Sequence, residues 1–422
     1  MTHFKYKDNQ FYCEDTLLKE IAEEYGTPLY VYSKNQIVEN YRSINGAFGE
    51  NDHVVCYALK ANSNPAILKL LADEGAGADV VSSGELYLAL RSGFSPDKIA
   101  FAGVGKREDE IEYALKENIH SLNVESVQEL QAISRVANRL QAKARVSLRI
   151  NPDISAESHP YITTGLQSNK FGIPAVKALE TFRFAATLQS IEVVGVHVHI
   201  GSQITKVDPF VATAKYIADL VQKVRQEGIH LTHVDFGGGI GTRYFNAIQN
   251  EALPKEDATQ DTIPTPADVV AAILPILTTT GCSLWLEPGR SMVADAGVLL
   301  TQVLYQKENG AKKFIVVDAG MNDLLRPSLY DAHHQIVPLI IDTYEHEKVD
   351  VVGPICESGD FLARERELCK VKQSDYLAVL TTGAYGFVNT SNYNARLRPA
   401  EILVNGDRIR VVRKRETYED LI

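Results

Sequence analysis

The stretch HVVCYALKANSNPAILKLLADEGAGADVVSSGELYLALRSGFSPDKIAFAGV, residues 53–104, contains the first three strands of a recurring unit. In this unit a short apolar strand is followed by a loop and an amphipathic helix. The unit recurs to about Arg290, and its eight strand candidates are VVCYALK (54–60), ADVVSS (78–83), IAFAGV (99–104), SLNVES (121–126), RVSLRI (145–150), VVGVHVHI (193–200), HVDFGGG (233–239) and LWLEPGR (284–290). Eight β/α units in roughly 250 residues are the size of a (β/α)8 barrel, so the sequence predicts an α/β fold of this kind.

The helices between the strands support this prediction. Leu130, Ile133, Val136 and Leu140 fall on one helical face between two of the strands, and a further helix over about 37–48 precedes the first strand. An open doubly wound sheet usually has fewer repeats and a GxGxxG motif at its first turn, which this sequence lacks.

After Arg290 the pattern changes to strands with few helices between them. The strand candidates of this region and of the N-terminus are VLLTQVLY (298–305), KKFIVVDAG (312–320), VDVVGPIC (349–356), YLAVLTTG (376–383), EILVNGDRIRVV (401–412), FKYKDNQFYC (4–13) and PLYVYS (28–33). Asn405-Gly406 indicates a hairpin turn. We predict a barrel domain over 35–285 and a β-rich sandwich or barrel domain built from 1–34 and 286–422. The polar, acidic stretch Asn250–Pro266 predicts a surface insertion.

Composition restricts the class of partner. The chain has 422 residues, 45% hydrophobic residues, a formal net charge of -11 and a pI of about 5.5. An acidic surface disfavours nucleic acid and anionic membranes as partners, so we expect a small-molecule substrate. The five cysteines fit neither a disulfide framework nor zinc spacing, and the N-terminus has no apolar signal region. We therefore expect a protein of the reducing cytoplasm.

Unusual polar residues end four of the predicted barrel strands. Lys60 ends the first strand, His199 the sixth, Gly237–Gly239 the seventh and Glu287–Arg290 the eighth. Because the active site of such a barrel lies at the carboxyl ends of its strands, these residues predict one site. By itself Lys60 is equally well a surface lysine. A lysine desolvated in a barrel mouth can instead lose its proton and form a Schiff base.

The other mouth residues allow both a functional and a structural interpretation. The triple glycine lets backbone N–H groups approach an anion, with Ser202 adding a hydroxyl, or it is a flexible turn. Glu287 can keep a pyridine nitrogen protonated and Arg290 can pair with a carboxylate, or the two form a structural ion pair.

His197 and His199 alternate on a strand and so share one face. Metal ligation and ordinary packing are the alternatives to a role with a cofactor. The sequence offers no clear carboxylate or cysteine set to complete a metal site, so we predict no metal and expect His199 to stack on a flat cofactor ring.

The β-rich region contains three motifs whose side chains could take part in catalysis or binding. GPICESGD places Cys356 and Glu357 in a polar loop, RPSLYDAHH contains Arg326 and Tyr330, and GAYGF holds Tyr385 between glycines. A free cysteine is often only a small apolar filler, and each motif is weak evidence by itself.

Together these motifs form an ordered set, which consists of YALKAN (57–62), GADVVSSGE (77–85), HVHIGSQ (197–203), DFGGGIG (235–241), EPGR (287–290), RPSLYDAHH (326–334), CESGD (356–360) and GAYGF (383–387). Over nearly the whole chain this set resembles the fold-type III decarboxylases that use pyridoxal 5'-phosphate (PLP), and among them the diaminopimelate decarboxylase family. The resemblance implies PLP as cofactor and the decarboxylation of meso-2,6-diaminopimelate to L-lysine and CO2.

The resemblance also implies a role for each site residue. Lys60 binds PLP covalently, His199 stacks on its ring, Glu287 pairs with the ring nitrogen, and Cys356 donates a proton to the product. The residues implied near the phosphate are Ser202, Gly238, Gly239, Gly289, Arg290 and Tyr385. The residues implied to hold the substrate are Arg290, Arg326, Tyr330, Glu357 and Tyr385.

In families of this kind two subunits pair head to tail, which implies a homodimer whose active sites combine Lys60 of one chain with Cys356 and Glu357 of the other. The alternatives within PLP enzymes are decarboxylases for ornithine, arginine or carboxynorspermidine, and alanine racemase, which resembles a design with a cation at the ring nitrogen. A non-catalytic PLP carrier would not need the β-rich domain, and a barrel enzyme without PLP would leave Lys60 and Cys356 without a role.

Overall fold

The structure is a computed structural model that describes residues 2–154, 169–256 and 263–422. It divides into two compact units. The barrel unit comprises Tyr41–Gly241 and Ile263–Ser291, and the β-rich unit comprises Met1–Asn40, Thr242–Thr262 and Met292–Ile422.

Within the described residues, the barrel unit contains a closed ring of eight parallel strands, so the predicted (β/α)8 barrel is confirmed. The strands are β5 (His53–Ala58), β6 (Gly77–Val80), β7 (Ile99–Phe101), β8 (Ser121–Val124), β9 (Ala144–Asn151), β11 (Ile191–His197), β12 (His233–Asp235) and β13 (Ser283–Leu286). The ring order is β9-β11-β12-β13-β5-β6-β7-β8, and the pairing of β8 with β9 closes it. A short strand, β10 (Ile173–Pro174), pairs with β9 outside the ring.

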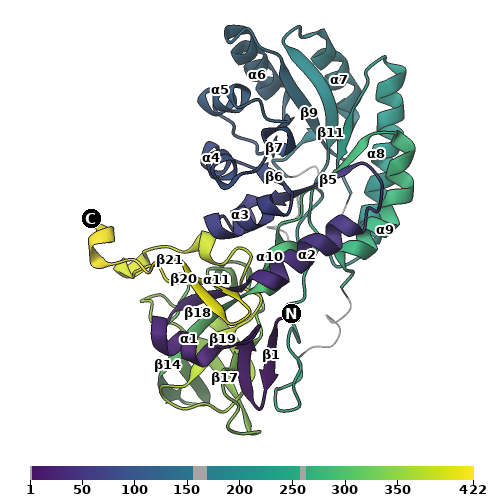
Figure 1. Ribbon diagram of the computed structural model, residues 1–422. Helices are drawn as coiled ribbons and strands as arrows, with labels where there is room; N and C mark the ends of the chain where they lie inside the picture. Colours follow the sequence, from purple (N-terminus) through teal and green to yellow (C-terminus); the bar gives the residue numbers. More distant parts are fainter. Residues whose placement is uncertain (1, 155–168, 257–262) are drawn as a thin grey trace. The chain divides into compact units, whose positions relative to one another are not determined.

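Helices cover the outside of this ring (Figure 1). They are α3 (Pro65–Asp73), α4 (Ser83–Ser92), α5 (Glu108–Lys116), α6 (Val127–Arg139), α7 (Ala178–Thr187), α8 (Asp208–Gln226) and α9 (Pro266–Leu277). Several begin at side-chain caps that the sequence supplies. Asn64 caps α3 ahead of Pro65, and Ser82 and Ser126 accept backbone N–H bonds at the starts of α4 and α6. These caps fix where each loop at the barrel mouth passes into its helix.

The strands end slightly earlier than their apolar runs suggest. β5 ends at Ala58, and Lys60 lies in a single 3-10 turn, Leu59–Ala61. β11 ends at His197, so His199 follows the strand, whereas Glu287 comes directly after β13. Apolar composition continues past the last ladder hydrogen bond, which is why the sequence fixes strand ends only to within one or two residues.

The β-rich unit is built around one mixed sheet. Its order is β18-β17-β15-β14-β4-β20-β21, and β19 pairs with β14 and with β16. The strands are β4 (Leu29–Ser33), β14 (Gly297–Asn309), β15 (Lys312–Val317), β16 (Ile336–Pro338), β17 (His346–Val352), β18 (Phe361–Cys369), β19 (Tyr376–Val379), β20 (Ala400–Asn405) and β21 (Arg408–Arg413). The strands β1 (Phe4–Lys7), β2 (Gln10–Cys13) and β3 (Thr16–Leu17) form a small antiparallel sheet.

The helices of this unit are short. They are α1 (Leu18–Tyr25) and α11 (Arg326–Tyr330), while α2 (Lys34–Gly46) and α10 (Arg290–Val293) contain the sequence boundaries between the units. The predicted N-terminal strands and the hairpin at Asn405-Gly406 are present as β1, β2, β4 and β20–β21. Sequence reasoning missed β18, whose charged residues ARERE interrupt its apolar pattern.

The segment around residue 250 differs from the predicted surface insertion. Ile248, Ala252 and Leu253 are buried in the core of the β-rich unit, and Ala252 is only 1% exposed. The prediction was therefore wrong for the described start of Asn250–Pro266, where apolar side chains pack inward between polar neighbours. The predicted domain boundaries also differ from the two compact units, because residues 242–256 were assigned to the barrel.

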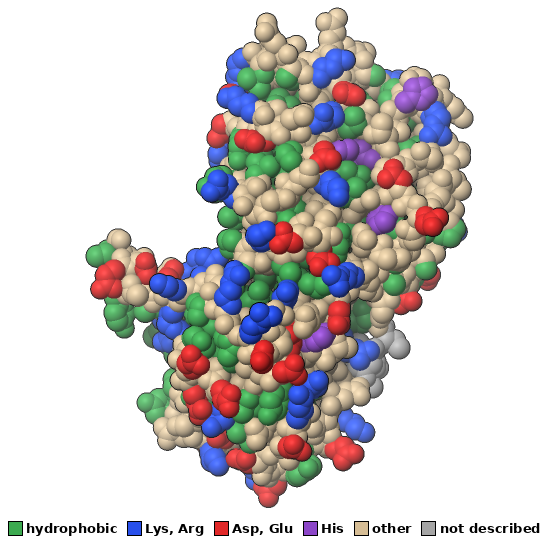
Figure 2. Space-filling model, in the orientation of Figure 1, with side chains coloured by type: hydrophobic (Ala, Val, Ile, Leu, Met, Phe, Trp, Pro, Cys, Tyr) green, Lys and Arg blue, Asp and Glu red, His purple; other side chains and the backbone are tan. Residues whose placement is uncertain are grey.

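On the face shown in Figure 2, acidic and basic side chains are interspersed. No helix in the described ranges is long and apolar enough to cross a membrane.

Candidate active site

A cavity of about 440 Å³ lies at the carboxyl ends of the barrel strands. Its lining includes Lys60, Arg149, Phe171, His197, His199 and Glu287. The volume is in the range of small-molecule and cofactor pockets. Three residues that the sequence placed at the mouth, Lys60, His199 and Glu287, therefore share one cavity.

Lys60 forms an ion pair with a carboxylate beneath it. Its Nζ lies 2.7 Å from Oδ2 of Asp79, which belongs to the adjacent strand β6. The Asp79 side chain is fully buried, whereas the Lys60 side chain is 39% exposed. Asp79 thus fixes the amine at the edge of the cavity and is also a base within reach of its proton.

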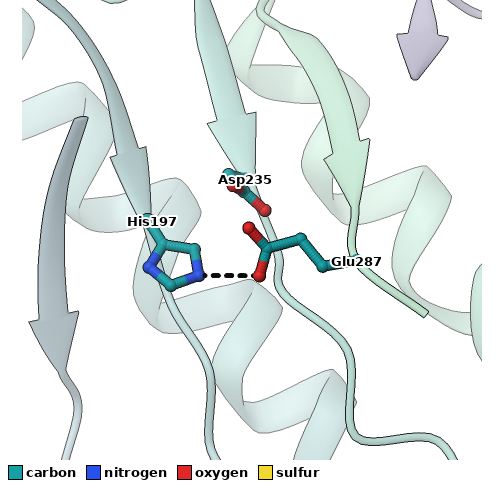
Figure 3. Close-up of side chains that lie close together, drawn as sticks. All are labelled: His197, Asp235 and Glu287. Carbon is teal, nitrogen blue, oxygen red and sulfur yellow. Dashed lines mark hydrogen bonds and ion pairs between the residues drawn. The ribbon is translucent and has the colours of Figure 1, made fainter. Parts of the chain in front are cut away.

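Figure 3 shows a second cluster, in which Glu287 lies between His197 and Asp235. His197 Nε2 is 3.1 Å from Glu287 Oε2. Asn123 Nδ2 donates to Asp235 Oδ2 at 3.1 Å and to Glu287 Oε1 at 3.3 Å. These side chains come from β8, β11, β12 and the residue after β13, which are brought together only by the closed barrel.

Burial controls the protonation of this cluster. Burial, followed by the charge of Asp79, raises the pKa of Glu287 from 4.5 to about 7. Burial and the neighbouring Glu287 raise the pKa of Asp235 well above its usual range. Burial lowers the pKa of His197 to about 4, so its imidazole is neutral near pH 7. Two carboxyls this close in a dry site cannot both ionise, unless a cationic group joins them.

The same three residues could hold a metal ion. Their donor atoms lie within 4.8 Å of one another, and they are the one such group of His, Cys, Asp or Glu found in the described ranges. The sequence showed no carboxylates that could complete a metal site with His197. The two carboxylates are separated from it by 38 and 90 positions, so only the barrel topology reveals them.

His199 presents a neutral ring to the cavity. Burial, then the positive charge of Arg149, holds the pKa of His199 well below 6.5. The backbone N–H of Gly238 donates to His199 Nδ1 at 3.1 Å, which fixes the ring orientation. A neutral, oriented imidazole can lie against a flat ring without charge repulsion.

The glycines at the ends of β12 and β13 are required by close packing. A Cβ at Gly238 would lie 2.2 Å from the carbonyl oxygen of Glu287, and one at Gly239 would lie 2.3 Å from that of Gly201. Gly239 also has a φ of 102°, which side-chain-bearing residues rarely adopt. At Gly289 a Cβ would approach the methyl groups of Ala58 and Ala61 at 3.1 Å. Contacts within the protein thus require glycine at 238 and 239, and the N–H of Gly238 donates to His199.

Arg290 and Ser202 form a polar pair in the same unit. Arg290 Nη2 donates to Ser202 Oγ at 3.0 Å, and Arg290 is only 7% exposed. A guanidinium and a hydroxyl side by side are suited to a phosphate or a carboxylate.

The five remaining predicted residues lie in the β-rich unit. Arg326 and Tyr330 are the first and last residues of α11, and Cys356 and Glu357 lie in the loop after β17. Ser328 Oγ donates to the carbonyl oxygen of Gly359 at 2.6 Å, which ties α11 to this loop.

Cys356 is exposed, and its backbone N–H donates to Asn394 Oδ1 at 2.8 Å. Tyr385 has a φ of 56°, an uncommon backbone conformation outside glycine that often marks a functional position. The structure therefore groups eight predicted residues in the barrel unit and five in the β-rich unit.

Comparison with known proteins identifies the family of the chain. Residues 34–294 match the sequence model of the family described as pyridoxal-dependent decarboxylase, pyridoxal binding domain. Diaminopimelate decarboxylase of Aquifex aeolicus is 44% identical over 100% of this chain and 96% of its own length, and that of Pseudomonas aeruginosa is 46% identical over 100% and 98%. The chain belongs to the diaminopimelate decarboxylase family of pyridoxal-dependent decarboxylases.

Solved structures of this family share the fold. The diaminopimelate decarboxylase of Helicobacter pylori in complex with L-lysine matches with a TM-score of 0.89 and 44% identity, covering 96% of this chain and 98% of that one. The enzyme from M. jannaschii in complex with L-lysine matches with a TM-score of 0.91 and 41% identity, covering 99% and 96%.

The barrel cavity fits PLP, the cofactor of this family. Glu287 is a buried carboxyl with a raised pKa, and a cationic N–H group such as a protonated ring nitrogen would favour its ionised form. Asp79 Oδ1 and His197 Nδ1 are buried without a hydrogen-bond partner among the described residues. Lys60 and Glu287, which line the cavity, would provide groups for the aldehyde and the ring nitrogen, and the Arg290–Ser202 pair of the same unit would suit the phosphate.

Sequence reasoning missed four members of this site: Asp79, Asn123, Arg149 and Asp235. Arg149, 6% exposed, lines the cavity at the end of β9, donates to Glu125 Oε1 at 2.6 Å and lies over the Phe171 ring at 4.7 Å. A signal was available, since Arg149 and Asp235 stand at strand ends in the same way as Lys60 and Glu287. Each was hidden inside an otherwise apolar run.

Proposed function

We propose that the chain decarboxylates meso-2,6-diaminopimelate to L-lysine and CO2 with PLP held in the barrel cavity. The observation that carries this proposal is that the buried Glu287 and Lys60 line one cavity in a chain that matches diaminopimelate decarboxylases over its full length. When bound, PLP supplies an electron sink for the pair left behind by the departing CO2. The product of this reaction, L-lysine, is the ligand named for two of the similar structures.

The barrel residues bind and tune the cofactor in this proposal. Lys60 would hold it covalently, and Asp79, 2.7 Å away, could accept the proton of its amine. Glu287 would keep the ring nitrogen protonated, and His199 would contact the ring. The residues proposed to bind the phosphate are Ser202, Gly238, Gly239, Gly289, Arg290 and Tyr385.

The β-rich unit recognises the substrate and returns a proton in this proposal. Diaminopimelate carries an ammonium and a carboxylate at the end that does not react, so its site needs an anion and a cation. Glu357 and Arg326 meet this need, with Tyr330 and Arg290 as further contacts. Cys356 donates the proton that replaces CO2 at Cα; it is exposed and follows strand β17, which supports its access to substrate.

The function is tested by measuring CO2 release and lysine formation from meso-diaminopimelate, ornithine and arginine, with Lys60→Ala as the inactive control. We expect turnover of meso-diaminopimelate and at most trace activity on the others, because ornithine and arginine lack the second carboxylate. Preferred turnover of ornithine or arginine would assign the chain to another decarboxylase of the same fold.

We further propose a homodimer in the cytoplasm, in which Cys356 and Glu357 of one chain complete the site around Lys60 of the other. The exposure of Cys356 supports the shared site, and the five free cysteines support a reducing cytoplasm. Lys60→Ala and Cys356→Ala should each be nearly inactive, yet a mixture that exchanges subunits should regain activity. Half of the dimers are then mixed with one intact site of two, so about a quarter of wild-type activity should return. If exchange is verified by native mass spectrometry and no activity returns, the site is built within one chain.

A further inference from the structure

The β-rich unit fixes the orientation of Arg326 through a buried histidine. Arg326 is 7% exposed, and its Nη1 lies 2.8 Å from Nε2 of His334, which is fully buried. A guanidinium has only N–H donors, so Nε2 must accept and the proton of His334 must lie on Nδ1. That proton points to the carbonyl oxygen of Leu380, 2.8 Å away and directly after β19. Both ring nitrogens of His334 thus form hydrogen bonds, so the imidazole fixes the guanidinium relative to the end of β19.

An aromatic ring supports the same guanidinium. The Arg326 Cζ atom lies 4.5 Å from the ring centroid of Tyr244, which is 6% exposed. The Tyr244 ring also packs edge-on against His334, with centroids 5.0 Å apart and an interplanar angle of 80°. Tyr244 and His334 therefore contact each other as well as Arg326, and together they form a rigid holder for its charged group.

Tyr244 belongs to residues 242–256, the described segment of the β-rich unit that includes the start of the predicted insertion Asn250–Pro266. Two sets of contacts anchor this segment. Glu256 pairs with His333 Nε2 at 2.9 Å and with Arg366 Nη1 at 3.1 Å, and Phe245 stacks on His333 with ring centroids 3.7 Å apart.

The second anchor is a side-chain amide. Gln335 Oε1 accepts from the backbone N–H of Ile248 at 2.9 Å, and its Nε2 donates to the Ile248 carbonyl at 3.1 Å. The anchors lie at His333 and Gln335, on either side of His334. The segment that contains Tyr244 is thereby fixed to the residues on either side of His334, so the distance between Tyr244 and His334 is maintained.

We propose that Tyr244 and His334 are positioning residues that hold Arg326 ready to bind the carboxylate that the substrate keeps and the product retains. This inference rests on the proposed role of Arg326 in diaminopimelate binding. A free arginine side chain has many rotamers and loses that freedom when it binds an anion. In the folded protein Arg326 has already lost this freedom, so its pairing with a carboxylate costs less conformational entropy than that of a free arginine side chain. The holder therefore sets specificity for ligands with a carboxylate at the non-reacting end.

Two ligands that differ by this one group provide the test. L-lysine retains the carboxylate, and 1,5-diaminopentane lacks it while keeping both amines. Their affinities for the PLP-loaded enzyme are measured by titration calorimetry, together with kcat and KM for meso-diaminopimelate. The variants are Tyr244→Leu and His334→Leu, and their conservative counterparts are Tyr244→Phe, which keeps the ring, and His334→Gln, which keeps an acceptor and a donor.

We expect Tyr244→Leu to reduce the preference for L-lysine over 1,5-diaminopentane by about 2- to 30-fold, the range of a cation–π contact. KM for diaminopimelate should rise in parallel with a smaller change in kcat. His334→Leu should act in the same direction, while Tyr244→Phe and His334→Gln should restore much of the preference. Val404→Ala, which removes buried side-chain atoms in β20, controls for general loss of stability and should leave the preference unchanged.

Arg326→Ala distinguishes a failure of the holder from a failure of the proposed role of Arg326. If it leaves the preference intact, Arg326 does not bind the carboxylate, and that part of the proposed function is wrong. If Arg326→Ala removes the preference while both Tyr244→Leu and His334→Leu keep it, the holder is wrong and the proposed function stands. Should His334→Leu fail to fold in a thermal melt, Tyr244→Leu decides by itself.

Discussion

The replacement Glu287→Gln tests the electrostatic basis of the site. It keeps the size and the hydrogen-bonding oxygen but removes the carboxylate. The rise in the pKa of Glu287 from 4.5 to about 7 disfavours the ionised form by about 3 kcal/mol, at 1.36 kcal/mol per pH unit. An ion pair with a protonated ring nitrogen offsets this unfavourable free energy. Loss of that ion pair should therefore slow decarboxylation by about 10²-fold, at the lower end of the effect of removing an electrostatic or acid–base group.

The same replacement has a consequence for the stability of the cofactor-free protein. A carboxyl whose pKa is raised by folding binds its proton more tightly in the folded state, so its contribution to stability is lost as pH rises from about 4.5 through 7. Glutamine removes this penalty. At pH 8 cofactor-free Glu287→Gln should be more stable than wild type by up to about 3 kcal/mol, and the difference should vanish near pH 4.

Two assays decide the matter. One is the rate of CO2 release at saturating PLP, with retention of the visible absorbance of bound cofactor. The other is the free energy of unfolding of the cofactor-free protein between pH 4 and 8. Asp323→Asn is a matched control, because burial also raises the pKa of Asp323 to about 7, but this residue lies in the β-rich unit. A rate of Glu287→Gln within a few-fold of wild type, or a stability difference that does not change with pH, would refute the reasoning.

Three further outcomes are expected. Lys60→Ala should abolish turnover and the visible absorbance of bound PLP, because Lys60 is the lysine that lines the described cavity; an intact band would mean that another lysine binds PLP. Arg326→Ala should weaken diaminopimelate binding by about 2–5 kcal/mol, since it leaves a carboxylate unpaired, and an unchanged KM would contradict this. Dialysis against a chelator should leave CO2 release unchanged if the cluster of His197, Asp235 and Glu287 serves a ring proton; lost activity that zinc or another divalent ion restores would identify it as a metal site.

Local patterns were sufficient to predict the barrel. The eight ring strands are short, largely apolar runs because most of their residues are buried, and the helices between them give the regular repeat. The predicted mouth residues Lys60, His199 and Glu287 line one cavity for the same reason, since the carboxyl ends of parallel strands meet at one edge. β18 was missed because its pattern alternates irregularly between charged and apolar residues.

What the sequence could not supply was the pairing between distant residues. Asp79 lies beneath Lys60, and Asp235 lies beside Glu287, only because β6 follows β5 and β12 precedes β13 in the closed ring. Asp235 stands at a strand end, but nothing in its own run or in that of Asp79 shows which residue each carboxylate contacts. They nevertheless change the chemistry: burial and the charge of Asp79 raise the pKa of Glu287, while burial and Glu287 raise the pKa of Asp235, so the cavity is receptive to a cation.

The same limit applies to the β-rich unit. The motif RPSLYDAHH gives Arg326 and His334 as neighbours along the chain, but not that the histidine accepts a hydrogen bond from the guanidinium. Tyr244 precedes Arg326 by 82 positions, and the predicted domain boundaries assigned it to the barrel domain. A short polar sequence becomes part of a binding site when a few buried contacts, here those of Glu256 and Ile248, fix it to the core. Specificity in this chain is therefore expected to depend on residues that never touch the substrate, which is the property that the paired Tyr244 and His334 variants measure.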